Sequence, residues 1–207
     1  MSNQPVCNRP DLPWAGRGTN LDISGCRFSL YPMHSDFVRI ILGALEKTDT
    51  SNVWSQSDAL STVYRGKLPY VVDAVYGLFA NACEDGVHMA LEGLFSKGCP
   101  GDSDGDSFLA ATGMPPNRAK VNGDFPVQAK IELYPLGDGD YIDSIAEAVH
   151  EATRQGLNPQ SIHYATRISG TAAKIFDYLQ FVCQTMQDAA THYVLHFTLS
   201  VNSPTAE

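Results

Sequence analysis

The sequence has few cysteines, and none of them stands in a spacing that binds metals. The five are Cys7, Cys26, Cys83, Cys99 and Cys183. Their odd number and the absence of any C-x-x-C pair argue against a disulfide framework and against a zinc ribbon. Reduced thiols in a cytoplasmic protein are the simpler expectation.

The sequence also lacks the long apolar runs of membrane proteins and the basic surplus of nucleic-acid-binding proteins. No stretch approaches about 18 apolar residues, and the first 24 residues contain no apolar segment typical of a secretory signal. Lysines and arginines number 14 against 23 aspartates and glutamates, a net charge of −9. We therefore expect a cytoplasmic protein that is not membrane-embedded and binds no nucleic acid.

Familiar catalytic and metal-binding motifs are missing as well. There is no G-x-S-x-G, P-loop, G-x-G-x-x-G or H-E-x-x-H. Residues 102–106, DSDGD, suggest calcium, but an EF-hand needs Gly and Glu where this chain has Ser107 and Gly113. His192 and His196 have no further ligand in a suitable spacing, which favours a solvent-facing or interface pair. The sequence thus predicts no metal site, no catalytic residue and no cofactor.

What the chain does contain is an internal repeat. FSLYPM at residues 28–33 returns as IELYPL at residues 131–136, an offset of 103 residues. One extra residue in the next turn moves the offset to 104, and this register holds to the C-terminus. The matching pairs include Asp73 with Asp177, His88 with His192, and Ser96 with Ser200. Two copies of this length indicate duplicated domains rather than a solenoid.

Each copy predicts the same order of elements. An alternating strand precedes an amphipathic helix, two further strands, a second helix and a closing strand. In the second copy, residues 160–169 are expected to be a strand. The order β-α-β-β-α-β is the ferredoxin-like unit. The predicted fold is therefore α+β, with tandem ferredoxin-like repeats whose antiparallel sheets carry both helices on one face.

The repeat also predicts the domain boundaries. Residues 1–24 are expected to be a poorly ordered arm, 25–100 the first repeat and 126–207 the second. Residues 101–125, rich in Gly, Asp and Pro, are expected to be a connecting loop. The sheet face opposite the helices has mixed polarity, so it fits packing against the other repeat or against a second chain.

Two threonines stand at the same point of both repeats. Thr62, with Leu60 on the same face, and its equivalent Thr166 are expected to point toward the helices from the third strand of each copy. A buried hydroxyl needs a partner, so each is either bonded to backbone or a polar group in a small pocket. Leu30 and Leu133, on the neighbouring first strands, would line the same space.

Several longer stretches resemble the YkoF family of thiamin- and hydroxymethylpyrimidine (HMP)-binding proteins. They are RFSLYPM, ALEKTDTSNVW, LSTVYRG and LFSKGCPGDSDGDSFL, then ELYP, IHYA and LSVNSP. The resemblance covers roughly residues 25–205. It implies tandem ferredoxin-like units, one site per unit for the pyrimidine half of thiamin, a homodimer and no known catalysis. It also implies an association with uptake of the precursor by an ECF-type permease.

The resemblance places the ligand sites by motif. The first site would involve Leu30 and Thr62, and the second would involve Leu133, Ala165 and Thr166. The two repeats differ near these residues: Ser29 becomes Glu132, Ala59 becomes His163, and Ser61 becomes Ala165. We therefore do not expect the two sites to bind the ligand with equal affinity. A carboxylate could favour the cationic thiazolium, and the sequence offers Glu132, Asp102 or Asp106.

Two other classes of function remain open. An enzyme of thiamin-pyrimidine salvage would use Cys99 or His163 as its reactive group. A regulatory or scaffold module, a frequent use of ferredoxin-like units, would bind neither compound. The leading hypothesis is a non-catalytic binding protein with thiamin or HMP as its ligand.

Overall fold

The first repeat contains the predicted β-α-β-β-α-β order. The computed structural model describes residues 11, 20, 22–97, 103–137, 140–190 and 192–205 of the chain. The elements of the first repeat are β1 (Ser24–Pro32), α1 (Phe37–Lys47), β2 (Trp54–Ser57), β3 (Thr62–Gly66), α2 (Leu68–Ala82) and β4 (Met89–Lys97). Helix α2 carries a proline in its first turn, where the missing N–H has no partner to lose.

The second repeat has the same order, with one difference from the prediction. Its elements are β5 (Pro126–Leu136), α3 (Tyr141–Arg154), β6 (Gln160–Ser161), β7 (Thr166–Thr171), α4 (Ala172–Ala189) and β8 (His192–Val201). Residues 160–169, expected as a strand, instead form a hairpin with a turn after β6. His163 and Tyr164 have φ of 53° and 62°, the left-handed pair that matches the twist of a two-residue hairpin.

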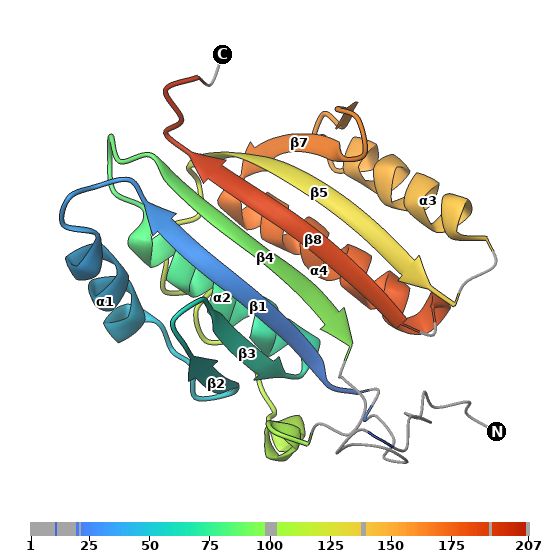
Figure 1. Ribbon diagram of the computed structural model, residues 1–207, viewed down its shortest axis with the longest axis horizontal. Coiled ribbons are helices and arrows are strands. Elements are labelled where there is room, and N and C mark those ends of the chain that lie inside the picture. The colour runs from blue at the N-terminus through green and yellow to red at the C-terminus, as the bar shows by residue number, and fades with distance from the viewer. Residues whose placement is uncertain are drawn as a thin grey trace.

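All eight strands of the described part of the chain belong to a single antiparallel sheet. Their order is β2-β3-β1-β4-β8-β5-β7-β6, so each repeat has its closing strand at the junction. The four α-helices lie on the same side of this sheet (Figure 1). The predicted α+β fold of tandem ferredoxin-like units is confirmed. The opposite side, called the open face here, is covered by neither repeat, because the repeats lie edge to edge.

The junction between β4 and β8 is a pseudo-two-fold axis. Gly93 pairs with Phe197 across it, and these two residues are also equivalent positions of the repeats. A Cβ on Gly93 would lie 2.8 Å from the Phe28 Cβ and 3.0 Å from the Phe197 ring. The ring of Phe197 stacks on Phe95 with centroids 5.2 Å apart. Two large side chains do not fit on the axis, so glycine on one strand makes room for phenylalanine on the other.

Hydrogen bonds on the open face follow the same symmetry. His88 Nε2 lies 3.2 Å from Ser200 Oγ, and His192 Nε2 lies 3.2 Å from Ser96 Oγ. Each bond links one repeat to the other. The histidines that the sequence pairs by position thus serve the same structural role in both repeats.

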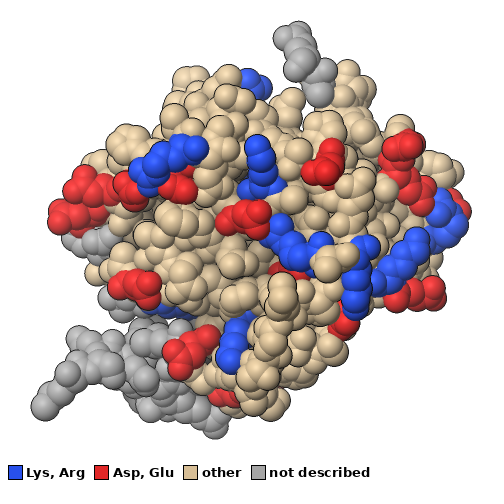
Figure 2. All heavy atoms as spheres, turned by 180° about the vertical axis from the view of Figure 1, so that it is seen from behind, with Lys and Arg blue, Asp and Glu red and all other residues tan. Residues whose placement is uncertain are grey.

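The hydrophobic core lies between the sheet and the helices. On β8, Tyr193, Leu195, Phe197 and Leu199 are fully buried, and the residues between them face the open side. The equivalent helices α2 and α4 cross the centre of the sheet, where the rings of Tyr76 and Phe176 pack edge to face at 5.4 Å. On the helix side, acidic and basic side chains are interspersed (Figure 2).

The connecting segment is anchored on α2 by the buried Asp73. Its carboxylate accepts hydrogen bonds from the backbone N–H groups of Asn117 and Arg118, both at 2.9 Å, and from the Asn117 side chain at 2.8 Å. Gly77 leaves the space for Asn117, because a Cβ there would lie 2.7 Å from that side chain. Arg118 then reaches α4 and pairs with Asp177, the equivalent of Asp73, at 2.8 Å. Within the described ranges, no helix is long and apolar enough to cross a membrane.

Substitution at the pseudo-two-fold axis should destabilise the fold. Gly93→Ala forces a methyl group against Phe28 and Phe197, and we expect a loss of about 1–3 kcal/mol in the free energy of unfolding. Gly43→Ala is the matched control, because nothing lies within 4 Å of its Cβ position in α1. That variant should gain roughly 0.5–1 kcal/mol. Urea unfolding measures both changes, and equal stability of the two variants would contradict the packing described here.

Candidate functional site

A cavity of about 210 Å³ lies in the first repeat, between β1, α1, α2 and the turn that joins β2 to β3. Its lining consists of Phe28, Ser29, Leu30, Tyr31, Ile41, Leu45, Asp58, Ala59, Leu60, Ser61, Thr62 and Leu78. Leu30 and Thr62, the residues expected at the first site, therefore meet in one hollow. Their meeting follows from the register, since Phe28 pairs with Thr62 and Leu30 is the next residue on that face.

One side of this cavity is apolar. Ile41 and Leu45 come from the inner face of α1, and Leu78 comes from α2. Tyr31 and Leu60 stand at the mouth with exposed fractions of 49% and 84%. Large apolar side chains that remain this exposed around a hollow are typical of a surface that contacts a ligand or a partner.

The other side is polar and is formed by the turn at residues 58–61. The Asp58 carboxylate accepts hydrogen bonds from the backbone N–H of Leu60 at 2.8 Å and of Ser61 at 2.9 Å. Arg27 on β1 donates to Asp58 Oδ2 at 3.1 Å and to Ser61 Oγ at 2.7 Å, and Ser29 Oγ donates to the Leu60 carbonyl at 2.9 Å. These contacts hold the turn against β1 and keep the cavity open.

Thr62 differs from the expectation in its surroundings. Its side chain is half-buried, and its hydroxyl lies 2.8 Å from Ser57 Oγ on the adjacent strand rather than on a backbone group. Leu60, expected to point toward the helices with Thr62, is instead exposed in the turn. That expectation was wrong because β3 begins only at Thr62, so strand alternation does not extend back to Leu60.

The second repeat places its predicted residues in the same way. Thr166 pairs with Ile131 as Thr62 pairs with Phe28, and Leu133 is the next residue on that face of β5. Leu133 is partly buried against the core. Ala165 closes the hairpin, where its carbonyl accepts the Ile162 N–H at 3.1 Å. The backbone framework of the first site thus recurs around these positions.

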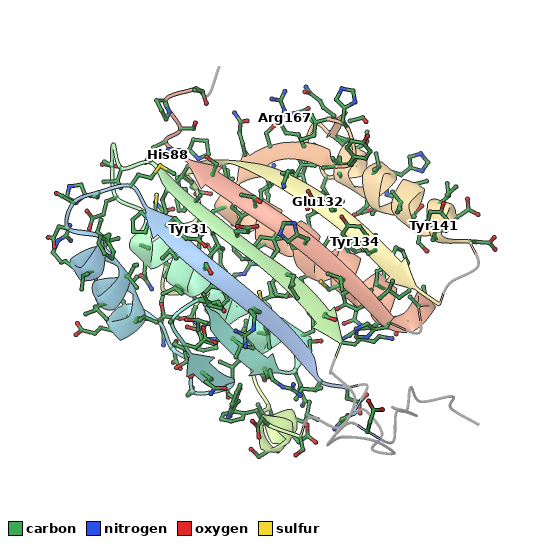
Figure 3. All side chains as sticks on the ribbon, viewed as in Figure 1. Tyr31, His88, Glu132, Tyr134, Tyr141 and Arg167 are labelled. Atoms are coloured by element: carbon green, nitrogen blue, oxygen red, sulfur yellow. The ribbon has the colours of Figure 1, made fainter. Side chains whose placement is uncertain are left out.

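The polar groups around the second framework are different. Glu132, which replaces Ser29, is on the open face and does not bond to the turn (Figure 3). Its carboxylate pairs with Lys130 at 2.9 Å and with His196 Nδ1. Burial acts to raise the pKa of the Glu132 carboxyl, but the hydrogen bonds from His196 and Lys130 hold it below its ordinary value.

Exposed apolar side chains recur at equivalent positions of both repeats. In the second repeat, Tyr164 at the hairpin tip is fully exposed, at the position of Leu60. The equivalent pairs are Tyr31 and Tyr134, Met33 and Leu136, Phe37 and Tyr141, Val38 and Ile142, and Leu60 and Tyr164. Exposure preserved at paired positions makes both surfaces candidates for contact with a ligand or a partner.

Other residues named from the sequence lie elsewhere. Cys99 and Asp102 fall outside the described residues. Asp106 begins a short 3-10 helix, η1 (Asp106–Ala110), and does not line the cavity; the carboxylate there is Asp58. Among the described residues, no group of three or more His, Cys, Asp or Glu side chains could hold a metal.

Sequence reasoning missed the polar side of the cavity. Asp58 stands just before the two central residues of a hairpin turn, where aspartate commonly bonds the backbone N–H two residues later. This local signal was present in the sequence. The contacts of Arg27 and Ser29 with the turn were not readable in advance, because they depend on the pairing of strands about 30 residues apart.

Comparison with known proteins gives two matches. The profile of the YKOF-related family matches residues 23–102 and 126–206. A Bacillus subtilis (strain 168) protein, YkoF, which is named as a candidate HMP/thiamine-binding protein, is 40% identical over 185 residues, which cover 88% of this chain and 92% of that protein.

The pKa of the Asp58 carboxyl should lie below its ordinary value. Hydrogen bonds from the backbone of Leu60 and Ser61, and then from Arg27, hold its pKa below its ordinary value of 3.8. Because the folded-state pKa is the lower one, these contacts stabilise the fold above the unfolded-state pKa, and this contribution is lost as the pH falls through the folded value. NMR titration of the carboxyl carbon checks this, and Arg27→Gln should raise the value. A pKa at or above 3.8 in the unmodified protein would contradict the geometry of the turn.

Proposed function

The chain belongs to the YKOF-related family, and we propose that it is a non-catalytic binding protein for thiamin or its pyrimidine precursor HMP. The observation that carries the proposal is the cavity in which Leu30 and Thr62 meet. Its volume of about 210 Å³ is smaller than the roughly 300–1,000 Å³ of sites for drug-sized ligands. This favours one flat ring inside the cavity, with the rest of a larger ligand outside.

The lining suits an aminopyrimidine. The ring offers an exocyclic amino donor and nitrogen acceptors, which the Thr62 and Ser61 hydroxyls and the strand backbone can satisfy. Leu30, Ile41 and Tyr31 supply apolar surface for the ring faces. These groups do not match the thiazole half of thiamin, so we place the pyrimidine half inside the cavity.

The thiazolium of thiamin would lie toward the mouth. Asp58 is the carboxylate that lines the cavity. Its carboxylate is ionised at neutral pH and already pairs with Arg27 at 3.1 Å, and its second oxygen adds negative charge that favours a nearby cation. In this proposal Asp58 takes the role that the sequence suggested for Glu132, Asp102 or Asp106.

We place a second pocket at Leu133, Ala165 and Thr166. The repeated register on β5 and β7 supports this position. The polar groups differ, because Glu132 is engaged with His196 and Lys130 and Ala165 has no hydroxyl. Unequal affinity of the two sites is therefore part of the proposal.

Calorimetric titration with thiamin, HMP and the thiazole alone tests these sites. Thiamin and HMP should bind and the thiazole should not. Thr62→Val and Thr166→Val should each remove one hydrogen bond, a loss of about 1–2 kcal/mol at its own site with the other site unchanged. Circular dichroism checks that each variant is folded.

In the same experiment, Asp58→Asn distinguishes the contribution of the thiazolium half of thiamin from that of the pyrimidine half. Asparagine keeps the acceptor that holds the turn but removes the charge, so thiamin should bind more weakly while HMP is unaffected. If neither thiamin nor HMP releases heat, the binding proposal fails and the scaffold reading is favoured. If either compound is turned over and Cys99→Ala abolishes the reaction, the protein is an enzyme instead.

The proposed setting is vitamin uptake or salvage in the cytoplasm, with an ECF-type permease as a functional partner. The family resemblance motivates the permease link. Cys26, Cys83 and Cys183 are free thiols, and Cys26 and Cys183 are buried. Free thiols are consistent with a reducing compartment.

We further propose a homodimer that covers the open face near the pseudo-two-fold axis. Leu94 lies on this face next to the axis, Val194 lies on it three residues from Phe197, and Tyr31 and Tyr134 on it are about half exposed. An eight-stranded sheet open to solvent on a partly apolar face suits packing against an identical sheet.

Val194→Arg should convert the dimer to a monomer, because it places a charge in the proposed interface. Light scattering coupled to gel filtration measures the mass. Gln184→Arg, exposed on α4 on the other side of the sheet, is the matched control and should leave the mass unchanged. A monomeric unmodified protein, or a Val194→Arg protein that stays dimeric, would contradict this interface.

A further inference from the structure

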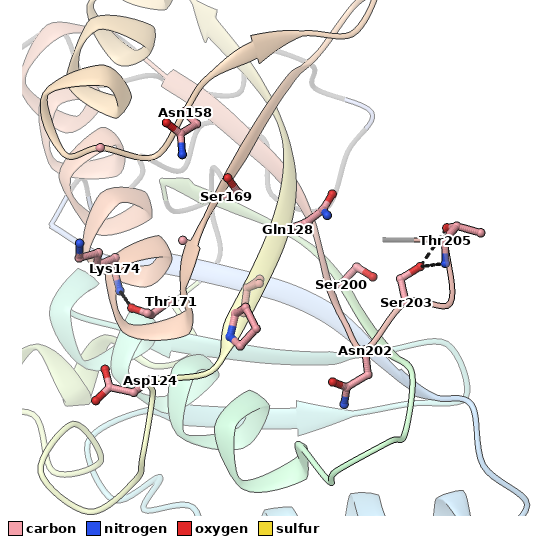
Figure 4. Close-up of a pocket in the computed structure, with 14 residues that line it drawn as sticks. Asp124, Gln128, Asn158, Ser169, Thr171, Lys174, Ser200, Asn202, Ser203 and Thr205 are labelled. Carbon is pink, nitrogen blue, oxygen red and sulfur yellow. Dashed lines mark hydrogen bonds between the residues drawn. The ribbon is translucent and has the colours of Figure 1, made fainter. Parts of the chain in front are cut away.

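A larger hollow lies in the second repeat, at the opposite end of its strands from Leu133 and Thr166. Its volume is about 740 Å³, and it adjoins a hollow of about 490 Å³ with which it shares Gln128, Asn158, Ser169 and Thr205. The two together are called the polar groove here. The walls of the larger hollow come from the start of β5, the loop after α3, the end of β7, the first turn of α4 and the C-terminal segment (Figure 4). The adjoining hollow adds Gln160 of β6 and Arg167 near the start of β7. No lining residue is shared with the cavity of the first repeat.

The groove is rich in hydrogen-bonding groups that are not used within the fold. The side chains of Gln128, Asn158 and Ser169 form no hydrogen bond with any other described residue. All three are at least partly exposed. In contrast, Ser203 and Thr205 bond to each other at 3.0 Å. The uncommitted amides and hydroxyl are therefore available to a molecule from outside.

The groove is also lined by the two basic side chains of the second repeat that form no ion pair with a described carboxylate. This repeat has four basic residues, of which Lys130 and Arg154 form ion pairs with carboxylates. Arg167 and Lys174 pair with no carboxylate among the described residues, and both line the groove. Among the described residues, the Arg167 guanidinium donates a hydrogen bond to the uncharged Gln160 side chain and to no other group. Asp124, in the larger hollow with Lys174, is the one acidic lining residue, and the adjoining hollow with Arg167 has none, in a chain of net charge −9.

The walls are held in place by contacts outside the groove. The Asn202 side chain donates to the carbonyls of Glu84 at 3.1 Å and Val87 at 3.0 Å, which ties the C-terminal segment to the loop before β4. Thr171 caps α4 by accepting the Lys174 N–H at 3.4 Å. Lys174 thus stands in the first turn of a helix of 18 residues, where the backbone also favours negative charge.

We propose that the polar groove binds the phosphate or diphosphate group of a small organic phosphate. Arg167 offers a planar pair of N–H donors and Lys174 a point charge, the two side chains that proteins commonly use for phosphate oxygens. Gln128, Asn158 and Ser169 add neutral donors between them. The groove shares no lining residue with the cavity of the first repeat, and its Arg167 directly follows Thr166 of the proposed second pocket.

Calorimetric titration of the full chain with inorganic phosphate and inorganic diphosphate tests the proposal. We expect diphosphate to bind more tightly than phosphate, and both to weaken as ionic strength rises. Arg167→Gln and Lys174→Gln should each lower the affinity for diphosphate about tenfold. Lys47→Gln is the matched control, because Lys47 is an exposed lysine without an ion pair among the described residues, at the far end of α1. It should leave the affinity unchanged.

Four results would overturn the assignment, and three of them come from the titrations with anions alone. The first is no binding of either anion at millimolar concentration, which would mean that the groove is closed or too weak. The second is binding that neither Arg167→Gln nor Lys174→Gln reduces. The third is tighter binding of malonate than of diphosphate, which would assign the groove to dicarboxylates. Diphosphate binding that persists at saturating thiamin supports a separate site, and displacement by thiamin counts against it.

Discussion

The structure depends on the pairing of β4 with β8. Each ferredoxin-like unit alone would leave its closing strand as an edge with unpaired backbone N–H and C=O groups, which invites association with other chains. Pairing the two edges satisfies those groups and produces one continuous sheet. Because the helices of both units then lie on the same side, the open face is also continuous. On the axis, Gly93 of β4 faces Phe197 of β8, so the two strands meet without two bulky side chains in one place.

The duplication has preserved the backbone more closely than the polar chemistry. In the first repeat, Arg27 and Ser29 hold the turn between the hairpin strands. In the second repeat, Glu132 turns instead to His196, and the hairpin relies on left-handed residues at its tip. The same framework can therefore present similar apolar walls with different donors and acceptors. This is the physical reason to expect two sites of the same kind and of unequal strength.

The two ends of the second repeat have contrasting surfaces. Around Leu133 and Thr166 the exposed groups are mainly aromatic and aliphatic, with Tyr164 and Ile142 fully or largely in solvent. At the other end of the same strands, the lining of the larger hollow is mainly amide and hydroxyl, with Lys174 and Asp124 as its charged residues. An antiparallel sheet makes this separation possible, since residues four or five apart on one strand are about 15 Å apart.

The sequence by itself determined the duplication, the order of the elements and the helix-facing side of most strands. It also predicted that Leu30 and Thr62 line the same space between the sheet and the helices, and it indicated the YKOF-related family. These are properties of periodicity and of a constant offset, which are readable along the chain. The edge-to-edge joining, the hairpin after β6, the exposure of Leu60, the contacts of Arg27 and Ser29 with the turn at Asp58, and the positions of Arg167 and Lys174 were decided only by the tertiary structure. They depend on which strands become neighbours, and that choice comes from packing between residues far apart in the chain, for which local pattern carries no signal.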